Sequence, residues 1–271
     1  MENAMPVAPV ERLVRLIHGD CLDVMRGMET DSVDLVLCSP PYESARSYGI
    51  DFDRRGQDWV DWSVERFLEC VRVCRGLVAW VVEGQTKQFQ WSATPALLLA
   101  DLHRRGVKLR KPPIYQRVGI PGSGGPDWWR NDYELIVCAS KGKLPWSDNT
   151  AIGHEPKYKT GGACSNRTQT GERVNGVTKY ALPTKANPGN VIRCHGGGGH
   201  MGSDLAHENE APFPEKLAEA FVLSFCPPGG IVLDCFSGSG TTAAVAVRHG
   251  RQAIAIDVRE SQIDLTRRRV G

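Results

Sequence analysis

Apolar residues in the first half of the chain fall into short blocks whose spacing alternates between that of strands and that of helices. Residues 33–38 are almost wholly apolar, as is typical of a strand buried in a parallel sheet, and residues 64–74 carry apolar side chains on one helical face. Further strands are expected at residues 13–17, 77–82 and 133–139, and further helices at residues 20–28 and 95–105.

The last quarter of the chain repeats this alternation. Its expected helices are residues 215–225, 241–249 and 260–269, and its expected strands are residues 231–234 and 252–257. Strands that alternate with helices in this way predict the α/β class, with a doubly wound, mostly parallel sheet covered by helices on both faces.

Between these two parts lies a segment of a different kind. Residues 141–202 show little apolar periodicity and are rich in glycine and polar residues, including the consecutive glycines 196–199. So long an irregular stretch inside a compact domain is usually either functional or mobile. We therefore divide the chain into residues 11–140, an inserted region at 141–202, and residues 203–271.

Length and composition narrow the class of protein. The 271 residues are 41% hydrophobic and 24% charged, which argues against wholesale disorder and against a membrane protein. The longest clean apolar run, at residues 77–82, is too short to cross a bilayer, and residues 1–10 do not resemble a secretion signal. The nine cysteines are an odd number without a CxxC pair, so we expect reduced thiols and a cytoplasmic protein.

A glycine-rich turn stands near the carboxyl end. Val-Leu-Asp-Cys-Phe-Ser-Gly-Ser-Gly-Thr-Thr, residues 232–242, runs from an apolar strand through a tight turn into a helix. Glycines admit a ligand close to the backbone, and free amides at a helix start favour an anionic group. About twenty residues later Asp257 ends the next strand, where its carboxylate could hold ribose hydroxyls. The turn also fits the dinucleotide pattern GxGxxA, but only 28 residues follow Ala243, too few for the rest of a dinucleotide domain.

A second motif, Cys-Ser-Pro-Pro-Tyr at residues 38–42, stands where the buried strand 33–38 ends. Ligands of open α/β sheets bind beyond the carboxyl ends of the strands, so this segment is expected to face the site. The prolines make a rigid turn without amide donors, which leaves the Ser39 hydroxyl and the Pro40 carbonyl as acceptors beside the ring of Tyr42. This set suits a planar heterocycle with an exocyclic amine; a purely structural turn is the alternative.

Together the two motifs resemble those of the DNA methyltransferases that use S-adenosylmethionine to methylate exocyclic amines. In that family (D/N/S)-P-P-(Y/F/W) is the catalytic motif and F-x-G-x-G the cofactor motif; here they are residues 39–42 and 236–240. The catalytic motif comes first along the chain, as in the circularly permuted β group of the family. Ser-Pro-Pro-Tyr is most typical of cytosine-N4 enzymes, whereas Asp at the first position is commoner in adenine-N6 enzymes.

The resemblance implies a Rossmann-like methyltransferase fold and a role for each motif residue. Tyr42 should stack on a target base flipped out of the duplex, while Ser39 and the Pro40 carbonyl accept hydrogen bonds from its amine, without a covalent enzyme intermediate. The catalytic residues implied are Ser39, Pro40, Pro41 and Tyr42. The cofactor-binding residues implied are Asp20, Cys21, Ser39, Pro214, Asp234, Phe236, Gly238, Ser239, Gly240, Thr241, Thr242 and Asp257.

Other segments resemble the family as well. Residues 18–21 resemble an element that lies against the cofactor adenine, and residues between 187 and 214 resemble the element that closes over its methionine end. Residues 130–137 resemble a later strand that commonly carries a His-Glu pair, with Tyr133 here in place of the His. Residues 141–186 match no element of the family, which is typical of a target-recognition segment.

The formal net charge of +2 hides an uneven distribution of charge. Residues 1–140 carry 17 basic and 19 acidic side chains, residues 141–193 carry 9 and 3, and residues 194–271 carry 7 and 9. The positive excess therefore lies in the inserted region, where it could contact the phosphates of double-stranded DNA. The predicted DNA-binding residues are Lys157, Lys159, Arg167, Arg173 and Lys179. The resemblance leaves open a homodimer and a cognate restriction endonuclease.

Individual residues also have alternative interpretations. Cys38 could be the nucleophile of a cytosine-C5 methyltransferase, but those enzymes carry a Pro-Cys order, so a buried strand residue is expected. The cysteines and histidines at residues 164–207 fit no zinc-finger or ribbon spacing, and we predict no metal site. Trp128 and Trp129 mark either contacts to an extruded strand or, more simply, core packing before the next strand.

Alternatives for the whole protein remain open too. We expect a site-specific DNA methyltransferase acting on cytosine N4, and adenine-N6 methylation is its chief competitor. An RNA or small-amine methyltransferase and a non-catalytic DNA-binding relative are the others. The basic inserted region favours a polyanion over a small amine but does not distinguish RNA from DNA.

Overall fold

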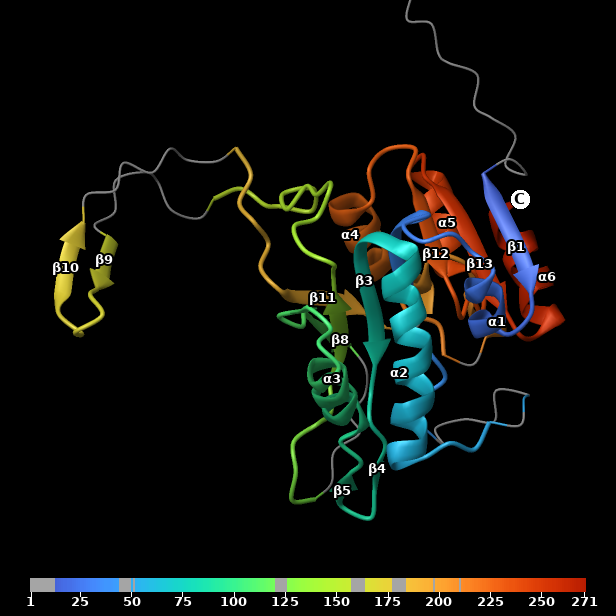
Figure 1. The fold of residues 1–271 in the computed structure, drawn as a ribbon, viewed down its shortest axis with the longest axis horizontal. Coiled ribbons are helices and arrows are strands. Elements are labelled where there is room, and N and C mark those ends of the chain that lie inside the picture. The colour runs from blue at the N-terminus through green and yellow to red at the C-terminus, as the bar shows by residue number, and fades with distance from the viewer. Residues whose placement is uncertain are drawn as a thin grey trace, which may run out of the picture.

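The structure is a computed structural model that describes residues 13–43, 50, 52–119, 126–156, 164–176, 184–196, 198–209 and 211–271. In this part of the chain the centre is a nine-stranded sheet (Figure 1). Its strands are β1 (Val14–His18), β2 (Val33–Cys38), β3 (Cys74–Val82), β6 (Leu109–Arg110), β7 (Ile114–Val118), β8 (Tyr133–Ala139), β11 (Val191–His195), β12 (Ile231–Asp234) and β13 (Gln252–Asp257). They stand in the order β1-β13-β12-β2-β3-β8-β7-β11, with β6 paired to β8.

Most neighbours in this sheet are parallel. Strands β1, β13, β12, β2 and β3 form one parallel block, and β7 is parallel to β11, while β8 runs antiparallel to β3, β6 and β7. Parallel neighbours need a crossover connection, and helices provide it from β2 to β3 and from β12 to β13. The predicted α/β class with a mostly parallel sheet is confirmed.

Helices cover both faces of the sheet, as the doubly wound prediction requires. Helices α1 (Cys21–Arg26), α2 (Gly56–Val73) and α3 (Thr94–Arg104) contribute to one core, and α4 (Glu215–Phe225) and α5 (Thr241–Arg248) to the other. Helix α6 (Glu260–Val270) packs on β1, β13 and α5. Strand β2 serves both cores, since Val36 and Cys38 enter the first while Leu35 and Leu37 enter the second. Because both faces of β2 are buried, its sequence is an almost unbroken apolar run.

Several elements differ from the sequence prediction. Helix α2 begins at Gly56 rather than at residue 64, and β3 begins at Cys74 rather than at 77. The region 141–202, for which no strand was predicted, contains β9 (Cys164–Arg167), β10 (Arg173–Gly176) and β11. Strands β9 and β10 pair as an antiparallel hairpin that stands apart from the main sheet (Figure 1). The remaining short elements are the hairpin β4 (Thr86–Lys87) and β5 (Gln90–Trp91) and the 3-10 helices Gly198–Met201 and Asp204–Glu208.

Side-chain exposure answers two questions that the sequence left open. Trp128 and Trp129 are 75% and 84% exposed, so the core-packing alternative for this pair is wrong. The cysteines whose side chains are described are buried and free of disulfides, in agreement with the expected reduced thiols. Within the described ranges, no helix combines the length and the apolar character needed to cross a membrane.

Candidate active site

The two sequence motifs meet at the centre of the sheet, where β12 lies beside β2. The register pairs Val232 with Leu35 and Leu233 with Val36, so both strands end at the same edge. Strand β12 leads through α5 to β13 on one side, and β2 leads through α2 to β3 on the other. This is therefore the point where the strand order reverses, which is where open α/β sheets bind their ligands.

Buried contacts join the two motifs directly. Cys38 Sγ lies 3.4 Å from Cys235 Sγ, and the Thr242 hydroxyl donates to the Leu37 carbonyl at 3.3 Å. Burial raises the pKa of the Cys38 thiol to about 12, so this sulfur stays protonated at neutral pH. Cys38 is a fully buried residue of β2, as the sequence analysis expected.

The glycine turn after β12 is shaped for a ligand to approach its backbone. Gly238 and Gly240 have φ angles of +49° and +76°, which residues with a side chain rarely adopt. A Cβ on Gly238 would lie 2.8 Å from Asn209 Nδ2, and one on Gly240 would lie 2.6 Å from Thr266 Cγ2. The Gly238 amide donates to Asp257 Oδ2 at 2.9 Å, which holds this carboxylate beside the turn.

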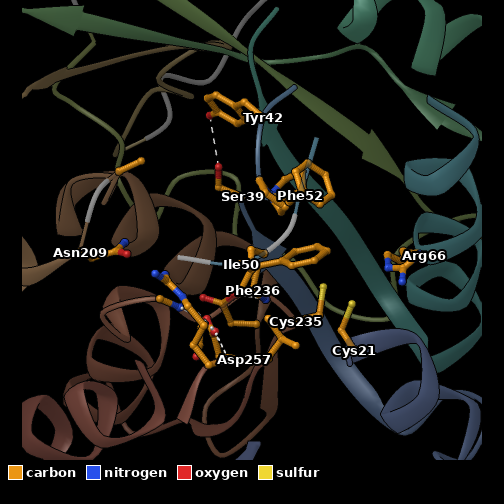
Figure 2. A pocket seen from close by; sticks show the side chains of 18 of the residues that line it. Cys21, Ser39, Tyr42, Ile50, Phe52, Arg66, Asn209, Cys235, Phe236 and Asp257 are labelled. Carbon is orange, nitrogen blue, oxygen red and sulfur yellow. Dashed lines mark hydrogen bonds and ion pairs between the residues drawn. The ribbon is translucent and has the colours of Figure 1, made fainter. Parts of the chain in front are cut away.

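A cavity of about 360 Å³ lies between the two motifs (Figure 2). The predicted catalytic and cofactor residues that line it are Asp20, Cys21, Ser39, Pro40, Pro41, Tyr42, Asp234, Phe236, Gly238, Ser239, Thr241 and Asp257. They come from the start of α1 and the residue before it, the turn after β2, the end of β12 with the turn that leads into α5, and the end of β13. The fold thus gathers distant parts of the sequence around one space.

Three predicted cofactor residues lie outside the lining of this cavity. Gly240 is the N-cap of α5, Thr242 is fully buried against β2, and Pro214 is the N-cap of α4. Pro212 and Phe213, which directly precede Pro214, line the cavity in its place.

Aromatic side chains that the sequence analysis did not single out support one side of the cavity. The Phe236 ring lies 5.7 Å from the Trp62 ring, which Phe52 meets edge-on at 5.0 Å. The Arg66 guanidinium lies 4.3 Å over Trp62 and donates to Asp20 at 2.9 Å. These residues stand on α2 or just before it, where the apolar pattern alone gave no sign that they border a ligand site.

Asp234 is the buried acid at the end of β12. Burial raises the pKa of its carboxyl to about 7, against the opposing effect of hydrogen bonds from Thr242 and from the Phe236 amide, which lies 3.1 Å from Oδ1. Near neutral pH the carboxyl is therefore divided between its neutral and ionised forms.

The turn after β2 also borders a second cavity, of about 370 Å³. Ser39 and Tyr42 line both cavities, as do Ala211, Pro212 and Phe213, so the Ser-Pro-Pro-Tyr turn forms part of the wall between them. The polar side chains that line only the second cavity are Glu83, Gln85, Tyr115, Arg117 and Glu134. Burial raises the pKa of the Glu83 carboxyl, and Glu134 raises it further. None of these residues except Glu134 lies in a segment that the sequence analysis had marked.

Hydrogen bonds orient the two side chains of this wall. The Tyr42 hydroxyl donates to Glu134 Oε2 at 2.7 Å. Ser39 Oγ lies 3.2 Å from the Tyr42 hydroxyl (Figure 2). It donates to the Val81 carbonyl at 3.1 Å. With the Ser39 proton directed at Val81, the oxygen lone pairs remain to accept a hydrogen bond from a ligand.

The predicted DNA-binding residues divide into two groups. Lys157, Lys159 and Lys179 lie outside the described residues. Arg167 and Arg173 are exposed, stand directly opposite one another in the β9–β10 hairpin, and line neither cavity. Across the described ranges, no group of three or more His, Cys, Asp or Glu side chains is placed to hold a metal ion.

A glycine turn facing a Pro-Pro turn across the switch point of an α/β sheet defines a class of proteins. Residues 33–268 match the family of DNA methylases that act on N6 or N4, and the chain belongs to that family. It is therefore a DNA methyltransferase of the kind that methylates an exocyclic amine of a base. The sequence-based assignment to this family is confirmed.

The chain is similar to individual members of the family. It is 30% identical over 261 residues to the DNA adenine methyltransferase YhdJ of Escherichia coli, covering 94% of this chain and 82% of that protein. It is also 30% identical to the orphan methyltransferase M.BamHII of Bacillus amyloliquefaciens, across 93% of this chain and 90% of that one.

Solved structures agree on the fold. The PvuII DNA methyltransferase, described as cytosine-N4-specific, aligns over 94% of this chain and 86% of its own with a TM-score of 0.68 and 19% identity. A DNA modification methylase of Thermus thermophilus, in complex with S-adenosyl-L-methionine, aligns over 94% of both chains with a TM-score of 0.60 and 21% identity. The named relatives therefore include both adenine and cytosine enzymes.

The cofactor of this family is S-adenosylmethionine, and the first cavity has the groups that such a molecule needs. A side chain at Gly238 would enter the space beside Asn209 at the edge of the cavity, so this glycine keeps the backbone open to a ligand, whereas Gly240 allows the turn to pack closely on Thr266 of α6. Asp20 and Asp257 offer carboxylate oxygens for amine and hydroxyl donors, and Phe236 offers an aromatic ring. The residues present fit the cofactor.

Proposed function

We propose that this protein transfers the methyl group of S-adenosylmethionine to N4 of cytosine within a specific sequence of double-stranded DNA. The observation that carries the proposal is the Ser39–Tyr42 wall between the two cavities. One cavity suits the cofactor, and the other would receive a base flipped out of the duplex. A serine at the first position of the motif favours cytosine over adenine.

Different residues of the first cavity would bind different parts of the cofactor. Asp257 accepts hydrogen bonds from the backbone amides of Gly238 and Arg259, one on each oxygen, and its carboxylate would also accept a hydrogen bond from a ribose hydroxyl. Asp20 and Cys21 would border the adenine. The first amides of α5, next to Thr241, would receive the methionine carboxylate. When bound, the cofactor supplies an electrophilic methyl group on a cationic sulfonium.

The turn after β2 would position the amine of the base. Ser39 Oγ and the Pro40 carbonyl would each accept one of its N–H groups, which directs the nitrogen lone pair toward the first cavity. Tyr42 would stack on the base, with its hydroxyl anchored on Glu134. Positioning of this kind supplies much of the rate gain when two reactants are held in an aligned geometry.

The inserted region at residues 141–202 would recognise the DNA target, between a catalytic half at residues 11–140 and a cofactor-binding half at residues 203–271. Like charges directly opposite one another on paired strands repel, and Arg167 and Arg173 are so placed. A phosphate group near both side chains would relieve that repulsion. Neither a homodimer nor a cognate endonuclease is required by this arrangement.

Mass analysis of the methylated product tests the proposal. Unmethylated genomic DNA is incubated with the purified protein and isotope-labelled cofactor, then digested to nucleosides, and the labelled product is identified by mass. We expect N4-methyldeoxycytidine. A variant that combines Ser39→Ala with Tyr42→Ala should bind cofactor and transfer no label.

Each other outcome identifies a different function. N6-methyldeoxyadenosine as the sole product would replace cytosine by adenine as the target. Transfer to structured RNA in preference to duplex DNA would make the protein an RNA methyltransferase, and DNA binding without any transfer would make it a non-catalytic relative.

A further inference from the structure

The second cavity contains a buried donor that the methyl transfer described above does not use. Arg117 of β7 lines this cavity with 23% of its side chain exposed, and its buried Nε has no hydrogen-bond partner among the described residues. A buried charged donor without a partner is costly, and such groups are satisfied by ligands or by water. The unpaired Nε therefore points to a ligand atom that accepts a hydrogen bond.

The rest of this guanidinium is held in a fixed position. Arg117 Nη2 donates to the Asn131 carbonyl at 3.0 Å, and Nη1 lies 3.5 Å from Glu134 Oε1. The other oxygen of Glu134 accepts from Tyr42, whose hydroxyl is 3.2 Å from Ser39 Oγ. This chain of contacts connects Arg117 to the end of the cavity where the amine of the base would lie.

The charges around Arg117 favour a neutral ligand in this cavity. Glu134 faces the guanidinium, and Glu83 is close enough for the charges of both Arg117 and Glu134 to act on its pKa. A phosphate placed among two carboxylates would be repelled, whereas an uncharged base would not. Arg117 is therefore better placed for a base than for the DNA backbone.

Cytosine and adenine differ at the position that this donor would reach. Each presents an exocyclic amine next to a ring nitrogen that accepts hydrogen bonds. Beyond that nitrogen, cytosine carries the O2 carbonyl, which is a second acceptor, whereas adenine carries C2–H. With the amine at Ser39, a donor farther along the same edge meets an acceptor only when the base is cytosine.

We propose that Arg117 is a specificity-determining residue, whose guanidinium donates to O2 of the flipped cytosine and thereby excludes adenine. The inference rests on the proposed function, because it requires the second cavity to hold the target base. A site built to donate to a substrate group rejects an analogue that lacks the group, since its own polar group is then left buried and unpaired.

The test compares two target bases in otherwise identical duplexes. Once the methylated sequence is mapped, the full-length enzyme is assayed with labelled cofactor on duplexes that carry either cytosine or 2-thiocytosine at the target position. Sulfur is a weak acceptor, so wild-type kcat/KM should fall about ten- to a hundredfold on 2-thiocytosine, the effect of one hydrogen bond to a charged donor. Arg117→Met should lose a similar factor on cytosine and almost nothing more on 2-thiocytosine.

A neighbouring arginine provides the matched control. Arg193 of β11, the strand paired with β7, donates to Gln116 at 2.9 Å and does not line the second cavity. Arg193→Met should keep the wild-type difference between the two bases. Calorimetric binding of S-adenosylmethionine checks that Arg117→Met is folded. If it is not, Arg117→Lys, which keeps the charge but lacks Nε, is assayed on the same pair of duplexes.

Three results would each refute either the role of Arg117 or the proposed function. An Arg117 variant that retains the wild-type preference for cytosine over 2-thiocytosine refutes the role of Arg117, even when N4-methylcytosine is the product. Equal losses on both bases, together with a weaker salt dependence of DNA binding, would place Arg117 on the phosphate backbone and also refute it. A wild-type enzyme that forms only N6-methyladenine would instead refute the proposed function.

Discussion

At the scale of single residues, Tyr42 combines a flat ring with an anchored hydroxyl, and the two can be separated by mutation. Tyr42→Phe keeps the ring and loses the bond to Glu134, which orients the ring without touching the reacting atoms, so kcat should fall only a few-fold. Tyr42→Ala would also lose the proposed stacking on the base, which should lower kcat/KM by about ten- to a hundredfold. Label transfer at saturating cofactor measures both. If the Phe variant were as inactive as the Ala variant, the ring would not be the part that matters.

The raised pKa of the Asp234 carboxyl predicts that the stability of the fold depends on pH. A carboxyl whose pKa is higher in the folded than in the unfolded protein stabilises the fold fully below its unfolded pKa of about 3.9. That contribution is lost as the pH rises through the folded pKa of about 7. Asp234→Asn keeps an acceptor for the Phe236 amide but does not titrate.

Urea unfolding of Asp234→Asn and the wild type across this pH range measures the effect. The wild-type free energy of unfolding should fall relative to that of the variant by up to about 1.4 kcal/mol per pH unit. A constant difference between the two proteins would mean that Asp234 does not change its ionisation there.

Among the secondary-structure elements, the turn between β12 and α5 predicts which glycine affects cofactor affinity. Gly238→Ala combines a positive φ with a Cβ 2.8 Å from Asn209, so cofactor affinity should fall about tenfold or more. Gly250, at the far end of α5, also has a positive φ of +70°, but a Cβ there meets nothing within 4 Å. Gly250→Ala should therefore lose about 1 kcal/mol of stability and no affinity.

Titration calorimetry and thermal unfolding of the two glycine variants separate these effects. Equal affinity in Gly238→Ala and Gly250→Ala would show that the turn does not need to remain open to the ligand.

The elements also explain which features could be predicted from the sequence. The strands of the parallel block have continuous apolar runs because both of their faces are buried, and the two motifs are contiguous, so both were predictable. Strand β11 has a single buried residue, Cys194, and β7 has Tyr115, so neither has a strong apolar pattern. Helix α2 begins with Gly56, which has a low helix propensity, and the polar residues Gln57 and Asp58, so its start gave only a weak helical signal although Trp59 and Val60 are buried.

The residues that line the second cavity could not be predicted from the sequence, because only the order of the strands in the sheet brings them together. Glu83 follows β3, Arg117 is on β7 and Glu134 is on β8. No spacing along the chain connects these positions. They meet because β8 runs antiparallel between β3 and β7, and that order depends on long-range pairing rather than on local pattern.

At the scale of the whole molecule, the β9–β10 hairpin stands apart from the sheet and predicts a separable contribution to DNA binding. Replacing Arg167 and Arg173 with Gln should weaken binding and reduce the slope of log affinity against log salt by about one for each phosphate that is no longer neutralised. Cofactor affinity should not change, because neither residue lines a cavity.

A double variant at the other end of the molecule controls for total charge. Arg26 on α1 and Arg268 on α6 are 57% and 55% exposed in their side chains. Helices α1 and α6 lie on the side of the molecule opposite to the hairpin (Figure 1). Replacing both with Gln removes the same number of charges. If the two double variants changed the salt slope equally, the hairpin would have no special contact with DNA.

Because Ser39 and Tyr42, in the turn after β2, border both cavities, the cofactor and the base of the proposed reaction would belong to a single binding equilibrium. Any arrangement of this turn that the bound cofactor favours is the arrangement that an incoming base encounters, and the reverse holds as well. Thermodynamic reciprocity then requires that each substrate change the affinity of the other by the same factor, whichever binds first. A mutation in the turn would alter that common factor for both substrates together.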